Sequence, residues 1–71
     1  MQYLVVVEKS ENGYGAYVPD LPGCAAAAET REEVVNLIQE AIEFHIDGLK
    51  KSGEAVPEAK SHGEVVDVHA A

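Results

Sequence analysis

Thirteen acidic residues, three histidines and one cysteine are the side chains of this chain that could do chemistry. Two-metal hydrolysis of a phosphodiester needs carboxylates that converge on divalent ions. The apolar stretch Tyr3–Val7 carries no acid, and Glu40 and Glu43 fall on the polar side of the helix predicted below. We therefore expect no metal-dependent nuclease site and no enzyme activity.

The histidines and the cysteine give no stronger sign of a catalytic or metal site. His45, His62 and His69 lack the paired spacing of zinc ligands, and His45 lies beside apolar positions where a core or interface role is more common. Cys24 could form a nucleophile pair with a histidine only if the fold placed the two together. As the single cysteine it cannot form an intrachain disulfide, and we expect it to be a small buried hydrophobe. We expect no metal and no cofactor.

The charge of the chain is strongly one-sided. Five Lys and Arg against thirteen Asp and Glu give a net charge of −8, which argues against DNA binding by this chain alone because phosphate contacts need clustered cations. Acidity is compatible with a basic protein partner, but on charge alone we prefer the simpler interpretation that it keeps a small protein soluble. The sequence contains no signal peptide and no apolar run near the ~20 residues of a membrane span. These features and the lone cysteine predict a cytoplasmic protein.

The stretch Tyr17–Cys24 and the following Thr30–Glu33 organise the elements that must position these side chains. Pro19 and Pro22 fix a rigid turn, and Gly23 can adopt a backbone conformation closed to other residues. Thr30 and Glu33 have the spacing of a helical capping box. The chain therefore changes from strand to helix in this region.

The remaining elements follow from residue periodicity. Gln2–Lys9 predicts a strand that is apolar on both faces, and hence a central strand or one that meets a partner. Asn12-Gly13 predicts a hairpin turn into a second strand, Tyr14–Val18. Glu64–His69 predicts a final strand. The run Cys24–Ala28 is ambiguous, because alanine prefers helix. Its assignment to a strand depends on the flanking turn and on the family resemblance given below.

The predicted helix Thr30–Ser52 has one broad apolar stripe with additional apolar residues beside it. These extra residues either line the margin of the core or contact another subunit. A single core of this size rarely supplies more than ~3–5 kcal/mol, so we expect a homo-oligomer, most simply a two-fold dimer. A sheet edge or the flank of the helix could form the contact, and the candidate residues on the helix are Val35, Phe44 and Ile46.

Residues 1–71 thus predict one small α+β domain with a two-layer β-β-β-α-β arrangement. A hairpin meander followed by a right-handed crossover through the helix gives the mixed sheet order 3-2-1-4, with one long helix on one face.

From about Tyr3 to Pro57, the chain resembles the HicB-like antitoxins. The resemblance is carried by the order of several short motifs: Pro-Asp-Leu-Pro-Gly-Cys at 19–24, Thr-x-Glu-Glu at 30–33, Asn36, Glu-Ala-Ile at 40–42, and Gly-Glu-x-x-Pro at 53–57. It implies a truncated ribonuclease H-like fold. It also implies an antitoxin that binds and occludes a small basic mRNA-cleaving toxin of the HicA type.

Two further expectations come with the resemblance. Many members append a DNA-binding segment, and because this chain ends at Ala71 we expect a short, stand-alone member without one. The residues expected to contact the toxin are Asp20, Glu29, Glu32 and Glu33. Each also has a local explanation, since Asp20 can set a turn and the glutamates favour a helix start. The alternative function is a generic protein-interaction domain with no toxin partner.

Overall fold

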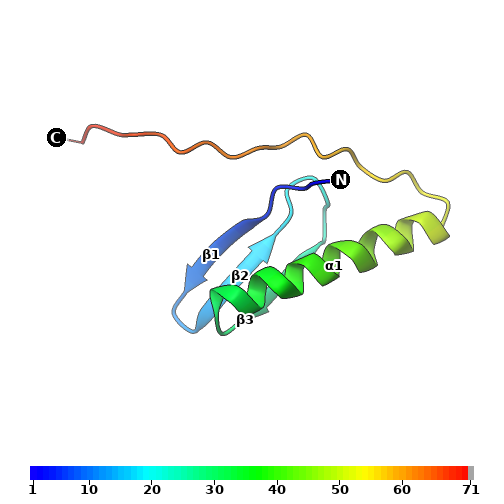
Figure 1. The fold of residues 1–71 in the computed structure, drawn as a ribbon, viewed down its shortest axis with the longest axis horizontal. Coiled ribbons are helices and arrows are strands. Elements are labelled where there is room, and N and C mark those ends of the chain that lie inside the picture. The colour runs from blue at the N-terminus through cyan, green and yellow to red at the C-terminus, as the bar shows by residue number, and fades with distance from the viewer. Residues whose placement is uncertain (71) are drawn as a thin grey trace.

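The computed structural model describes residues 1–70 and contains three strands followed by one long helix (Figure 1). The strands form one antiparallel sheet in the order β1-β2-β3, and the helix packs on one face of it, which confirms the two-layer α+β prediction. The elements are β1 at Val6–Ser10, β2 at Gly13–Tyr17, β3 at Ala25–Ala28 and α1 at Arg31–Lys51. Ala71, the last residue of the predicted domain, lies outside the described residues.

The hairpin between β1 and β2 turns through Glu11 and Asn12, and Ser10 pairs with Gly13. A Cβ atom at position 13 would collide with the carbonyl oxygen of Ala28, so only glycine fits where β2 passes β3 this closely. β1 begins at Val6 rather than at the predicted Gln2. The reason is its pairing, because Val6 lies opposite Tyr17, the last residue of β2.

The loop between β2 and β3 is held by its own backbone. Val18 donates to the carbonyl of Cys24, Leu21 to that of Val18, and Cys24 to that of Leu21. Gly23 has a φ of 85°, which favours glycine. This closed loop points Leu21 into the core with no exposed surface, where its burial contributes about 2 kcal/mol.

The alanine run forms the strand β3 in spite of its helical preference. Its residues pair in register with β2, from Tyr14 opposite Ala28 to Tyr17 opposite Ala25. Ala26 and Ala28 are half-buried against the core, whereas Ala25 and Ala27 are exposed. The small side chains let the helix lie close over this strand, so backbone pairing overrides the intrinsic propensity of alanine.

Both ends of α1 are capped. Thr30 is the N-cap, and its hydroxyl accepts a 3.1 Å hydrogen bond from the amide of Glu33. At the other end, Gly53 has a φ of 72° and donates to Lys50, and Glu54 donates to Leu49. This is the Schellman arrangement, which satisfies carbonyls that the helix leaves free.

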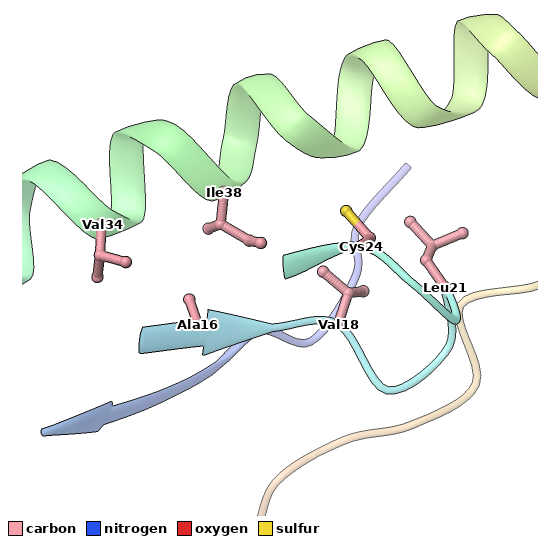
Figure 2. Packing of buried hydrophobic residues seen from close by; sticks show 6 residues of the cluster. All are labelled: Ala16, Val18, Leu21, Cys24, Val34 and Ile38. Atoms are coloured by element: carbon pink, nitrogen blue, oxygen red, sulfur yellow. The ribbon is translucent and has the colours of Figure 1, made fainter. Parts of the chain in front are cut away.

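The core is small and entirely apolar. Figure 2 shows Val34 and Ile38 of α1 pointing toward side chains of β2 and its following loop. Cys24 is buried there as expected, and burial raises the pKa of its thiol. The six buried residues are Ala16, Val18, Leu21, Cys24, Val34 and Ile38.

The predicted fourth strand is absent from residues 1–70, and this corrects two expectations. Glu64–His69 has no strand partner, so the sheet order stops at 3-2-1, without the final strand of a 3-2-1-4 sheet. β1 is consequently an edge strand, not a central one. After Gly63 the chain runs as an extended segment away from the sheet (Figure 1), and Val65 is fully exposed.

We predict that Thr30→Ala lowers the free energy of unfolding by about 1 kcal/mol, because the amide of Glu33 loses its acceptor. Urea denaturation at fixed protein concentration measures the change. Thr30→Ser retains the hydroxyl and should stay close to the parent protein. Equal midpoints for the alanine variant and the parent would contradict the cap assignment.

Candidate protein-interaction site

The structure divides the four acids that were predicted to contact a partner. Glu29, Glu32 and Glu33 are exposed together at the start of α1. Asp20 lies in the loop before β3, which is separated from the helix start by the length of that strand, about 13 Å at 3.3 Å per residue. The acids therefore form one cluster of three and one separate residue.

A shallow hollow of about 430 Å³ opens at the helix start. Glu32 and Val35 line it one turn apart, and the Val35 side chain keeps 43% of its surface exposed. We call this surface the helix-start site and define it as Glu29, Arg31, Glu32, Val35 and Asn36. It joins negative charge to an exposed apolar side chain, a combination that suits contact with a protein.

Two features moderate the negative potential of the helix-start site. Arg31 lies within it, and the N-terminus of a helix carries a partial positive charge that attracts carboxylates. Glu33 is also partly engaged, because the Thr30 hydroxyl donates a 2.9 Å hydrogen bond to its carboxylate. Glu29 and Glu32 are therefore the acids best placed to meet a basic partner.

Asp20 anchors a distant part of the chain. Its carboxylate accepts hydrogen bonds from the amides of Lys60 at 2.9 Å and Ser61 at 2.7 Å, and from the Ser61 hydroxyl at 2.7 Å. The amide and then the hydroxyl of Ser61 are the main causes that lower the pKa of Asp20. The Tyr3 hydroxyl donates to the carbonyl of Pro57 nearby. Together these bonds fix the connector, residues 54–63, to the N-terminal end of the sheet.

The three predicted oligomer contacts do not share one surface. Val35 and Phe44 point to opposite sides of α1, about half a turn apart at 3.6 residues per turn. Phe44 is 81% exposed, whereas Ile46 is half-buried against the core and lies on the same side as Val35. A single flat interface cannot use all three residues.

A second hollow, of about 530 Å³, lies between the N-terminal residues and the same side of α1 as Val35. We call it the β1-edge groove. Its lining combines apolar side chains from both segments with two polar residues of the helix. The lining residues are Met1, Tyr3, Gln39, Ile42, Glu43 and Ile46.

The groups considered for catalysis come from different segments of the fold. Cys24 is buried and holds its proton, so it is a poor nucleophile. His45 is half-buried on α1, and His62 lies on the connector, 3.3 Å from the Glu64 carboxylate. No group of three or more metal-ligating side chains comes together within residues 1–70.

Sequence reasoning missed two features of these surfaces. Val35 was assigned to self-association, but it lies beside Glu32 in the helix-start site, and the spacing of 32, 35 and 36 on one side of a helix could have indicated this. The partners of Asp20 had no such signal, because they are 40 and 41 residues away. None of the helices of residues 1–70 combines the length and the apolarity needed to span a membrane.

Comparison with known proteins gives a consistent family. A family profile described as HicB-like antitoxin of bacterial toxin-antitoxin system matches residues 3–70. A UPF0150 protein of Thermoplasma acidophilum is 41% identical over 71 residues, covering 99% of this chain and all of that protein. Antitoxin HicB 2 of Photorhabdus laumondii is 31% identical over 64 residues, covering 90% of this chain and 46% of that protein.

A solved structure described as a HicA3 and HicB3 toxin-antitoxin complex contains a similar chain. The TM-score is 0.72 and the sequence identity 28%, over 84% of this chain and 70% of that one. The likeness therefore covers most of the strands and the helix described above.

We predict that acid weakens the attachment of the connector. The folded-state pKa of Asp20 lies below its ordinary value of 3.8, so its carboxylate stabilises the fold above that pH, and the stabilisation is lost as pH falls through the lower folded-state pKa. Asp20→Asn places an amide donor against the donors of Lys60 and Ser61. It should therefore lower the free energy of unfolding at neutral pH.

Urea denaturation between about pH 7 and pH 2 checks this prediction. The difference between parent and Asp20→Asn should shrink toward the acid end, where both lack a carboxylate. Glu58→Gln, an exposed acid of the connector, is the matched control and should have little effect. A difference that stays constant over the whole range would contradict the role given to the Asp20 charge.

Proposed function

The chain belongs to the HicB-like antitoxin family, and we propose that it binds a small basic HicA-type mRNA-cleaving toxin and occludes its RNA-binding surface. The family match over residues 3–70 is the observation that carries this proposal. The likeness to a chain of a HicA3 and HicB3 complex supports it.

The charge of the chain supports occlusion in physical terms. An RNA-cleaving surface must be positive to hold phosphate. A chain of net charge −8 is attracted to such a surface and can compete with RNA for it. This mode of inhibition needs contact only and no chemistry by the antitoxin, and we propose that the chain is not an enzyme.

We assign the toxin contact to the helix-start site, with Glu29 and Glu32 as its charged residues and Val35 as its apolar one. Glu33 is a weaker contributor because it is hydrogen-bonded to Thr30. Asp20 would contribute only to a partner that spans the length of β3, and its carboxylate is already engaged by the connector.

The other parts of the proposal follow from the same features. We propose that the chain acts in the cytoplasm, where mRNA would be the toxin's substrate, and that by itself it does not bind DNA because its five cations are few and dispersed. We also propose that it forms a homo-oligomer, most simply a dimer, through one side of α1. Val35 and Ile46 share one side, and Phe44 lies on the other.

An inhibition titration tests the proposal. The purified chain is added to a basic HicA-type ribonuclease, and cleavage of a labelled RNA is followed. We predict full inhibition at one subunit per toxin, with association that slows as salt rises. Glu29→Lys combined with Glu32→Lys should raise the inhibition constant by about tenfold or more.

The control variant combines Glu54→Lys with Glu58→Lys, which makes the same change in net charge on the exposed connector. It should inhibit nearly as well as the parent, and both variants should unfold at nearly the parent midpoint. Equal losses in the two variants would show that only total charge matters. A toxin that stays fully active in excess chain would leave the generic interaction domain as the better reading.

A further inference from the structure

The β1 strand has an uncovered edge. It pairs only with β2, so within residues 1–70 the backbone groups on its other side have no strand partner. Soluble proteins usually blunt such an edge with charge, proline or a covering element. Here the segment leading into the edge is Leu4–Val7, which is apolar, and charge begins only at Glu8. The edge is therefore suited to receive another strand.

The side of α1 above this edge is also uncovered. Val35, Gln39, Ile42 and Ile46 recur at four- and three-residue steps and form one row along the helix. Val35 is 43% exposed, and Ile42 and Ile46 line the β1-edge groove. A strand added beside β1 would place every second side chain under this row. The free edge of β1 and the side of α1 above it are therefore suited to bind a strand with apolar residues at alternate positions.

Residues 64–70, which we call the tail, have this alternation of apolar residues but pair with no strand in the single chain. Val66 and Val68 share one side of it and are 72% and 81% exposed, and Val65 on the other side is wholly exposed. In Figure 1 the tail is extended and lies apart from β1. Exposed valines in an extended segment are an aggregation hazard unless another chain covers them.

The position of the connector determines whether the tail can pair with β1 of its own chain or with β1 of a second copy. Asp20 and Tyr3 hold residues 57–61, and Gly63 lies beside Leu4. Beyond it the tail points off the molecule. The Cα radius of gyration is accordingly 14.2 Å, against about 11 Å for a compact chain of this length. The tail is about 23 Å long when extended, which is long enough to span the β1 edge of a second copy.

We propose that the tail of one copy pairs with the free edge of β1 in a second copy, so that two copies exchange tails around a two-fold axis. Val66 and Val68 then pack beneath Ile42 and Ile46 of the partner copy, in the β1-edge groove, and Val35 at the helix start stays open to the toxin. The exchange completes the sheet as 3-2-1-4 with the fourth strand from the other chain. It also closes both β1 edges, so assembly stops at the dimer.

The exchanged tails would supply the contact of the homo-oligomer proposed above, and their pairing does not depend on toxin binding. Its failure is distinguishable from failure of the antitoxin proposal. A chain that inhibits the toxin while remaining a monomer would overturn the exchange and leave the proposed function intact.

Light scattering and sedimentation of the full chain provide the first test. We expect a dimer at micromolar concentration. Val66→Asp combined with Val68→Asp should raise the dimer dissociation constant by about a hundredfold or more, because carboxylates would enter an apolar site in both exchanged tails. Val65→Asp makes the same substitution on the other side of the strand and should have a much smaller effect. All three side chains are exposed in the single chain, so its fold should survive in each variant.

Isotope-filtered NMR on mixed dimers of labelled and unlabelled chains provides the second test. We expect methyl contacts between Val66 or Val68 of one copy and Ile42 of the other. Contacts found only within one copy of a monomer would show that the tail folds back on its own β1, and would overturn the proposal. A dimer that keeps its mass in the Val66→Asp and Val68→Asp variant would overturn it as well.

Discussion

The packing of one helix face onto one sheet face is the constraint on which the rest of this structure depends. Val34 and Ile38 supply the helix side of that contact, and Leu21 joins them from the loop that follows β2. The geometry of this contact depends on the closed Pro-Gly loop before β3 and on the Thr30 cap at the start of α1. The core consists of six buried residues, and within residues 1–70 no charged or polar side chain is buried. A core of this size gives only a small free energy of unfolding.

A core this small leaves apolar surface uncovered. The sheet face away from the helix presents Val6, Tyr17, Ala25 and Ala27, and α1 exposes Phe44 on one side and Val35 on the other. Contiguous exposed apolar surface in a small protein usually marks a contact with another molecule. A protein built in this way is fitted to act by binding, and its net negative charge is complementary to the basic toxin proposed above. The fold thus agrees with membership of an antitoxin family without requiring any catalytic group.

The sequence predicted the local features of this molecule well and the long-range ones poorly. The N-cap at Thr30, the helix end at Ser52 and the hairpin turn at Asn12-Gly13 each depend on neighbouring residues, and each is confirmed. The strand at Ala25–Ala28 could be assigned only with the flanking turn and the family resemblance, because its own composition favours helix. The bonds of Asp20 to residues 60 and 61 could not be predicted, since no periodicity links positions so far apart. The same bonds direct the tail away from its own sheet, which explains why a valine-rich segment with strand character has no partner in the single chain.

Amide hydrogen exchange can show directly whether the start of α1 is the surface that meets the toxin. The amides of Arg31 and Glu32 are in the first turn, where a helix offers no backbone acceptor, so they exchange rapidly in the free chain. Exchange is measured with and without a saturating amount of the cognate basic toxin. We expect exchange to slow over residues 30–36 when the toxin is present. Unchanged exchange over those residues, with new protection elsewhere on the chain, would contradict it.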